Sequence, residues 1–260
     1  MILKGKKALI MGLANDKSIA YGIAKSFKRE GAEIAISYAG ESVKKRVMPI
    51  AEELGTELVF ECDVSKDQDI ENLSNNIKEA WGNIDIVVHS IAYAPKDEFK
   101  NGVIDTTRAG FGIAMDISVY SFIAVVRAFS NIMNEEGAFL TLSYYGAQKV
   151  VPHYNVMGIA KAALESATRY LAFDIAKKNQ RVNCISAGPI KTLSAYSITG
   201  FHLLMEHTVK VSPLGRHVTI EEVGDTAAFL CSEWARGITG QTIYVDSGYS
   251  IMGVSDKEEE

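Results

Sequence analysis

The stretch Ala8-Leu-Ile-Met-Gly12-Leu-Ala-Asn-Asp-Lys-Ser18-Ile-Ala-Tyr-Gly22 decides the fold, because it joins a short apolar segment to an amphipathic one through a glycine. Gly12 permits a tight turn after the apolar segment, and Ser18 is suitably placed to cap a helix that follows. A helix that begins in this way presents amide donors that can bind a pyrophosphate. The stretch lacks the spacing G-x-G-x-x-G. An ordinary capped turn between a strand and a helix is therefore the alternative.

Short apolar segments alternate with longer amphipathic segments along the whole chain, a pattern typical of parallel strands joined by crossover helices. The predicted strands are Ala8–Met11, Glu33–Tyr38, Leu58–Cys62, Ile84–His89, Ala138–Ser143, Val182–Ser186 and Thr242–Val245. The predicted helices are Ile19–Glu30, Val43–Leu54, Asp67–Trp81, Phe111–Asn134, Tyr154–Lys177 and Ile220–Ser232. We therefore predict an α/β fold: a single-domain, Rossmann-like, doubly wound parallel sheet of seven strands with helices on both faces.

Length and charge set further limits. At 260 residues, 47% of them hydrophobic, the chain is expected to form one domain over 1–254, followed by a solvated acidic tail at 255–260. The formal net charge is -5 and no dense Lys/Arg run is present, so nucleic-acid binding is not expected.

Cysteine usage and hydropathy indicate the compartment. Cys62, Cys184 and Cys231 are widely spaced beside apolar segments, which predicts buried thiols in a reducing environment and no metal site. The sequence has neither a signal-peptide pattern nor a run of ~20 uninterrupted apolar residues. A cytoplasmic protein that does not bind a membrane is expected.

Ligands of doubly wound sheets bind outside the carboxyl ends of the strands, at the switch point between the first strand and the fourth. After the third strand, Asp63 could accept a hydrogen bond from an adenine amino group and Val64 could pack on the ring; a plain turn aspartate is the alternative. After the fourth strand, Ile91 follows small residues that let the backbone approach a cofactor. A lone His89 is more often a satisfied core histidine, so it receives no catalytic role.

The end of the second strand bears on the choice between NADH and NADPH. An acidic residue there usually accepts the ribose hydroxyls of NAD, but none stands at the expected position beside Ala39. Lys44, Lys45 and Arg46 follow within a turn and could meet a 2′-phosphate, or they could form a solvated helix face. NADH is favoured, with NADPH as the alternative.

Tyr144, Tyr154 and Lys161 form the set of residues most specific for chemistry. On a helix, Tyr154 and Lys161 would share a face roughly 10 Å apart along the axis, and a bound ribose could fill the gap between them. The alternative is two packing tyrosines and a surface lysine, which would not explain why they follow a strand end.

The residues together resemble the enoyl-acyl-carrier-protein reductases of bacterial fatty-acid synthesis, a divergent branch of the short-chain dehydrogenase/reductases, from about Leu3 to Met252. The resemblance rests on Ser18-Ile-Ala-Tyr-Gly, His89-Ser-Ile-Ala, Leu142-Ser-Tyr-Tyr-Gly, Tyr154-Asn-Val-Met-Gly-Ile-Ala-Lys161, Arg181-Val-Asn, Ile185-Ser-Ala-Gly-Pro-Ile and Val245-Asp-Ser-Gly-Tyr-Ser. Ordinary members of the superfamily use Tyr-x3-Lys, whereas Gly158 stands at that position here, and Phe111–Phe122 contains no Asn.

The resemblance implies reduction of a trans-2-enoyl thioester by hydride transfer from NADH to the β-carbon, in the last step of the elongation cycle. Tyr154 would donate a hydrogen bond to the thioester oxygen, where negative charge develops. Lys161 would hold the nicotinamide ribose, and Tyr144 would line the same pocket. These three are the implied catalytic residues.

Further residues follow from the same resemblance. The implied cofactor-binding residues are Gly12, Ser18, Ile19, Ala39, Asp63, Val64, Ile91, Lys161, Ile190, Lys191, Thr192, Leu193 and Ser194. The implied substrate-binding residues are Ala94, Tyr144, Tyr154, Met157 and Phe201.

The segment near 192–208 is expected to form a lid over an acyl chain, with an ordinary pair of surface helices as the alternative. Its middle, Ile198-Thr-Gly-Phe-His202-Leu-Leu, carries no Lys or Arg, so docking of the acidic carrier protein would fall to Lys191, Lys210 or Arg216. The family also implies a homotetramer, and the many apolar positions of the two longest helices agree with self-association.

Two other functions stay open on the sequence alone. A 3-oxoacyl or other carbonyl reductase of the superfamily is disfavoured by the missing Tyr-x3-Lys. A non-catalytic dinucleotide-binding sensor would need the phosphate loop but not Tyr144, Tyr154 and Lys161 together.

Overall fold

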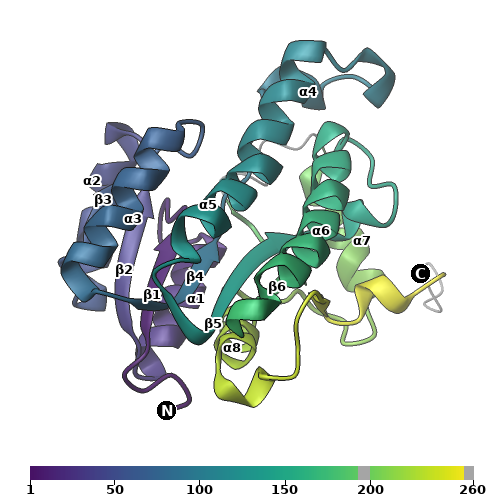
Figure 1. Ribbon diagram of the computed structural model, residues 1–260. Coiled ribbons are helices and arrows are strands. Elements are labelled where there is room, and N and C mark those ends of the chain that lie inside the picture. Colours follow the sequence, from purple (N-terminus) through teal and green to yellow (C-terminus); the bar gives the residue numbers. More distant parts are fainter. Residues whose placement is uncertain (193–199, 255–260) are drawn as a thin grey trace.

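The computed structural model describes residues 1–192 and 200–254 of the chain. Seven strands form one sheet in the order β3-β2-β1-β4-β5-β6-β7, and every neighbouring pair is parallel. The strands are β1 (Lys7–Met11), β2 (Glu33–Tyr38), β3 (Val59–Glu61), β4 (Ile84–His89), β5 (Met133–Ser143), β6 (Arg181–Ala187) and β7 (Thr242–Val245). The predicted doubly wound sheet of seven strands is confirmed, and its order reverses between β1 and β4 (Figure 1).

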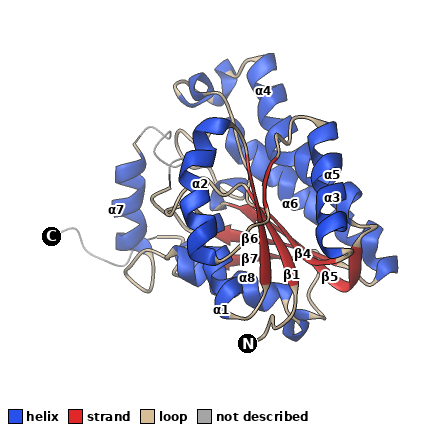
Figure 2. Cartoon of the chain, turned by 90° about the vertical axis from the view of Figure 1, so that its left-hand side faces the viewer, coloured by secondary structure: helices blue, strands red, loops and turns tan. Residues whose placement is uncertain are grey.

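Helices cover both faces of the sheet (Figure 2). Their bounds are α1 (Ile19–Arg29), α2 (Glu41–Leu54), α3 (Asp67–Trp81), α4 (Arg108–Met115), α5 (Ser121–Phe129), α6 (Val156–Ile175), α7 (Phe201–Val211) and α8 (Ile220–Cys231). One apolar core joins the sheet to α3, α5 and α6, and a second joins it to α1, α2 and α8. The strands β1, β2, β4 and β6 are almost entirely buried, which explains their continuous apolar runs, whereas the edge strands β3 and β7 are only partly buried.

The predicted helix Phe111–Asn134 is wrong at both ends. The helical stretch begins at Arg108, because Thr107 caps it by accepting a hydrogen bond from the amide of Gly110. It continues through a π-helical turn, Asp116–Tyr120, and ends at Phe129, after which β5 begins at Met133. The apolar residues past Phe129 that extended the pattern are Ile132, in the connection after the helix, and Met133, the first residue of β5.

Arg108–Phe129 is also the one stretch among the described residues that is long and apolar enough to cross a membrane by length and composition. Half of its most apolar window is buried inside the protein, as in a core helix. The stretch contains Arg108, Asp116 and Arg127, so it is not a run of ~20 uninterrupted apolar residues. Cys62, Cys184 and Cys231 are buried free thiols, as predicted.

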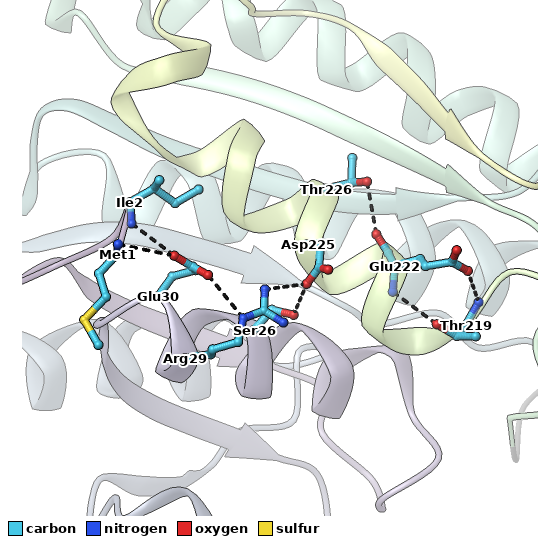
Figure 3. A network of polar contacts seen from close by, with 9 residues as sticks. All are labelled: Met1, Ile2, Ser26, Arg29, Glu30, Thr219, Glu222, Asp225 and Thr226. Carbon is cyan, nitrogen blue, oxygen red and sulfur yellow. Dashed lines mark hydrogen bonds and ion pairs between the residues drawn. The ribbon is translucent and has the colours of Figure 1, made fainter.

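The helices α1 and α8 approach each other closely enough to exclude side chains from part of their contact. A Cβ atom at Gly22 would overlap the carbonyl oxygen of Ile220, and one at Gly224 would overlap that of Gly22. Beside this contact, Asp225 accepts hydrogen bonds of 2.7 Å from both Ser26 and Arg29 (Figure 3). The contact fixes α1 on the sheet and so fixes where its N-terminus lies.

Replacing Gly22 or Gly224 by Ala is expected to lower the free energy of unfolding by about 1–3 kcal/mol, because the added methyl group must separate the two helices. Urea unfolding of each variant measures this effect. Gly112→Ala is the matched control, since Gly112 lies in α4 with nothing within 4 Å of an added Cβ. An unchanged unfolding midpoint for Gly22→Ala would contradict the close contact.

Candidate active site at the carboxyl edge of the sheet

The turns after β1 and β4 meet at the switch point. Gly12 has a φ of +83°, and a Cβ atom there would overlap the carbonyl oxygen of Ser90 and lie 2.7 Å from Cγ1 of Ile91. The amide of Ser90 donates to the carbonyl oxygen of Met11 at 3.2 Å, which ties the two turns together. Gly12 is therefore needed both for its backbone conformation and for space. Gly12 and Ile91, which were both predicted to bind the cofactor, are therefore brought together.

The N-terminus of α1 follows this turn and is capped as predicted. Ser18 accepts a hydrogen bond from the amide of Tyr21 at 3.3 Å and donates one to the carbonyl oxygen of Asn15 at 2.7 Å. The amides of Ile19 and Ala20 open the helix, where no preceding turn supplies an acceptor. Together with the helix dipole, they suit a pyrophosphate.

Asp63 and Val64 follow β3, but their side chains are largely engaged within the protein. The carboxylate of Asp63 accepts hydrogen bonds from the amide and hydroxyl of Ser65, at 3.1 and 2.7 Å. These bonds lower the pKa of Asp63, and the bond from the Ser65 hydroxyl has the largest effect. Val64 is buried in the core that contains α3. Asp63 has the contacts of a turn aspartate, while Ala39, after β2, is exposed at the same edge.

Tyr144 and Tyr154 meet beyond the end of β5. Their rings pack edge to face, with 4.9 Å between the centroids. The hydroxyl of Tyr144 is buried and has no hydrogen-bond partner among the described residues. Burial raises the pKa of both phenols well above the usual value, so both are hydrogen-bond donors at neutral pH. A buried unpaired hydroxyl is costly, and a bound ligand with an acceptor atom would satisfy it.

Tyr154 does not lie on α6, contrary to the prediction, but immediately before it. His153 and Asn155, on either side, have positive φ angles of 65° and 46°. The side-chain amide of Asn155 donates to the carbonyl oxygens of Glu98 at 3.2 Å and Asn101 at 2.5 Å, which holds this bend. A Cβ atom at Gly146 would lie 2.5 Å from Cδ1 of Tyr154. Strained backbone on both sides and close packing thus fix the phenol.

Lys161 is buried on α6, and its ammonium group donates to the carbonyl oxygen of Leu142 at 2.7 Å. Burial lowers the pKa of Lys161 to about 8, while electrostatic interactions with Cys184 and Glu165 act in the opposite direction. Lys161 is therefore largely protonated at neutral pH and loses its charge under mildly basic conditions. The hydrogen bond points it at the strand end that carries Tyr144.

Ala94, Tyr154 and Met157 are buried in the apolar core that joins the sheet to α3, α5 and α6. Phe201 is buried at the start of α7. Ile190 and Thr192 continue from the end of β6 at the same edge, and Lys191 is exposed. Leu193 and Ser194, and the first part of the predicted lid, lie outside the described residues.

Several residues at the site escaped the sequence analysis. Glu165 lies one turn after Lys161 on α6, and only 2% of it is exposed; a lone carboxylate in an otherwise apolar helix stretch was the available signal. Asn155 gave no signal, because its role depends on the distant Glu98 and Asn101. His89 is a core histidine, as expected: its ring contacts the hydroxyls of Ser121 at 2.8 Å and Thr141 at 3.3 Å.

Two other observations concern metal binding and the positive charges that were predicted to dock the carrier protein. No group of three or more His, Cys, Asp or Glu in the described ranges could hold a metal ion. Arg216 forms hydrogen bonds of 2.6 and 2.9 Å with Glu222, so its charge is already paired, whereas Lys191 and Lys210 are exposed.

Comparisons with known proteins agree with this geometry. Residues 12–250 match the protein family described as Enoyl-(Acyl carrier protein) reductase. The NADH-dependent enoyl-acyl-carrier-protein reductase of Aquifex aeolicus is 66% identical over 260 residues, which cover 100% of this chain and 96% of the relative. A crystal structure of the Aquifex aeolicus enzyme has a TM-score of 0.96 and covers 98% of this chain and 100% of that one.

A further solved structure carries a cofactor. It is the Anaplasma phagocytophilum enoyl-acyl-carrier-protein reductase in complex with NAD, 47% identical with a TM-score of 0.95, covering 99% of this chain and 98% of that one. The family match over residues 12–250 and the 66% identity lead to one conclusion, with which the tight turn at the switch point and the buried tyrosine pair agree: this chain belongs to the enoyl-acyl-carrier-protein reductase family.

Proposed function

We propose that this protein is an NADH-dependent enoyl-acyl-carrier-protein reductase in which Tyr154 stabilises the enolate, with Tyr144 and Lys161 beside it. The reaction reduces the trans-2 double bond of the enoyl thioester, the last step of the fatty-acid elongation cycle. The observation that carries the residue assignment is the pair of buried phenols, one of which has no hydrogen-bond partner among the described residues, together with a buried lysine that binds the carbonyl oxygen of Leu142.

The residues around the switch point fit a dinucleotide. Gly12 leaves no Cβ between the turns after β1 and β4, and Ser18 and Ile19 open a helix whose first amides suit an anion such as a pyrophosphate. NADH, when bound, would supply the hydride for the β-carbon, and a proton delivered through Tyr154 to the α-carbon would complete the reduction. We assign its remaining contacts to Ala39, Asp63, Val64, Ile91, Ile190, Lys191, Thr192, Leu193 and Ser194. Oδ1 of Asp63 accepts both hydrogen bonds from Ser65, so we assign the adenine amino group to Oδ2, which lies 3.4 Å from Nζ of Lys66.

The protein's own residues then act in three ways: as hydrogen-bond donors, as a positive charge and as an apolar lining. Tyr154 donates to the thioester oxygen, because a fixed donor in a water-poor site stabilises developing charge more than water does. Tyr144 offers its unpaired hydroxyl to the same pocket. Lys161 holds the nicotinamide ribose and supplies positive charge, while Ala94, Met157 and Phe201 line the acyl chain. The lid near 192–208 would cover that chain.

The oligomeric state, the cellular compartment and the partners of the enzyme are part of the same proposal. Tyr170 and Phe173 are 72% and 80% exposed on the outer face of α6, which supports self-association as a homotetramer. A solution mass equal to that of one chain would contradict it. The three buried free thiols agree with a cytoplasmic protein, and we propose no membrane and no nucleic acid as partners.

The activity is tested by loss of NADH absorbance with a trans-2-enoyl thioester, run beside a 3-oxoacyl thioester and with NADPH in parallel. Oxidation driven by the enoyl substrate and NADH is expected. Turnover of only the 3-oxo substrate would make the protein a carbonyl reductase, and binding without turnover would make it a sensor. In the same assay, Lys210→Glu should raise the KM for the carrier-bound substrate and leave the KM for NADH unchanged, because Lys210 is exposed and is not among the proposed cofactor contacts.

Tyr154→Phe is expected to lower kcat by about 100- to 1000-fold, the typical cost of losing one donor to a developing oxyanion. NADH affinity, measured by fluorescence titration, should stay unchanged. Tyr145→Phe is the control, because Tyr145 packs against Tyr244 and Tyr249 outside the proposed pair. A Tyr154→Phe variant with full rate would remove Tyr154 from the mechanism.

NADH affinity is expected to fall as the pH rises through about 8, because Lys161 then loses the positive charge with which it holds the nicotinamide ribose. Below that pH the lysine is protonated and affinity should be constant. Lys161→Met should bind NADH weakly at every pH, with this pH dependence gone. Equal pH profiles for the wild type and Lys161→Met would exclude the assigned role.

A further inference from the structure

A second buried charge lies behind the proposed catalytic residues. Glu165, 2% exposed, follows Lys161 by one turn on α6. Its Oε1 accepts a hydrogen bond of 2.6 Å from the hydroxyl of Ser143, and its Oε2 accepts one of 2.6 Å from the side-chain amide of Gln148. Both oxygens of this carboxylate are therefore used, and both donors are neutral. No role in the proposed reaction explains the cost of burying it.

The two donors stand on either side of Tyr144. Ser143 is the last residue of β5, and Gln148 ends the short helical turn Tyr145–Ala147. Glu165 thus accepts a hydrogen bond from each end of the segment 143–148, and Tyr144 lies between these two ends. Lys161 holds the preceding carbonyl group, that of Leu142, at 2.7 Å. Two charged residues of one helix face therefore fix three points of the chain around Tyr144.

Glu165 also acts on the charge of Lys161. The ionisable groups that affect Lys161 come from three elements: Glu165 on α6, Cys184 on β6 and His89 on β4. Burial lowers the pKa of His89 to about 3, so the imidazole is neutral, and burial raises that of Cys184 to about 12, so the thiol is neutral at neutral pH. Glu165 is then the negative charge among these three that favours protonated Lys161.

We propose that Glu165 is a positioning residue of the active site, which fixes Tyr144 through Ser143 and Gln148 and keeps Lys161 positively charged. The use made of Tyr144 and Lys161 rests on the proposed function. The link between Glu165 and Lys161 does not, because it exists in the protein without cofactor or substrate.

The first measurement is the protonation midpoint of Lys161 in the cofactor-free full-length protein, followed by NMR of side-chain ¹³C-labelled lysine. The Lys161 signal is identified by its loss in Lys161→Met. Glu165→Gln keeps the side-chain shape and removes the charge, so the midpoint should move to a lower pH. Ser143→Ala is the matched control: it removes one hydrogen bond and leaves the charge, so the midpoint should stay unchanged.

The second measurement is turnover of the enoyl thioester at a pH where Lys161 is protonated in both variants. Ser143→Ala and Glu165→Gln should each lower kcat, because Tyr144 is less firmly held. Glu165→Asp, which keeps the charge on a shorter side chain, should lower kcat without moving the Lys161 midpoint.

An unchanged midpoint in Glu165→Gln would overturn the electrostatic role, and an unchanged kcat in all three variants would overturn the positioning role. If Glu165→Gln does not fold, the triple variant Ser143→Ala, Gln148→Leu, Glu165→Met removes the charge together with both donors and carries the same midpoint test. Absence of turnover in the wild type would refute the proposed function alone, since the midpoint measurement needs no turnover.

Discussion

The parallel pairing of β1 with β4 is the constraint on which the rest of the structure depends. Met11 stands beside His89 in that pair, so the turns that follow, at Gly12 and Ser90, leave the sheet side by side. Because the chain runs from β1 to β2 in one direction and from β4 to β5 in the other, the following helices diverge to opposite faces. The carboxyl ends of all seven strands meet at one edge, and the capped start of α1 and the tyrosine pair both lie there.

The groups at that edge are held at a cost in stability. Lys161 and Glu165 are charges removed from water, and the hydroxyl of Tyr144 lacks a partner among the described residues. Such groups destabilise a fold unless hydrogen bonds compensate them. The compensation comes from the end of β5, where Leu142 accepts from Lys161 and Ser143 donates to Glu165. The same bonds fix the direction in which Tyr144 leaves the strand, so the cost of burial is also what makes the site rigid before a ligand binds.

Prediction from the sequence succeeded where local chemistry decides the structure. The tight turn at Gly12 and the helix cap at Ser18 were predicted correctly. The place of His89 in the core was also predicted correctly, since a lone histidine is more often a core residue. Prediction failed where distant contacts decide. The pattern from Tyr154 to Lys161 suggested one helix, but Asn155 takes a positive φ because its side chain binds the carbonyl groups of Glu98 and Asn101. The helix expected to reach Asn134 ends at Phe129, since an apolar run does not distinguish a buried helix from the turn and strand after it.

The sequence by itself determined the alternation of strands and helices, the family and the residue types of the site, because hydrophobic period, turn residues and motif spacing are properties of the chain alone. Only the tertiary structure decided how those residues act. It buries Lys161 and so lowers its pKa to about 8, brings Glu165 to Ser143 across 22 positions of sequence, and leaves the Tyr144 hydroxyl unpaired among the described residues. Burial and pairing of this kind depend on which distant segments are packed together, and no local pattern records that.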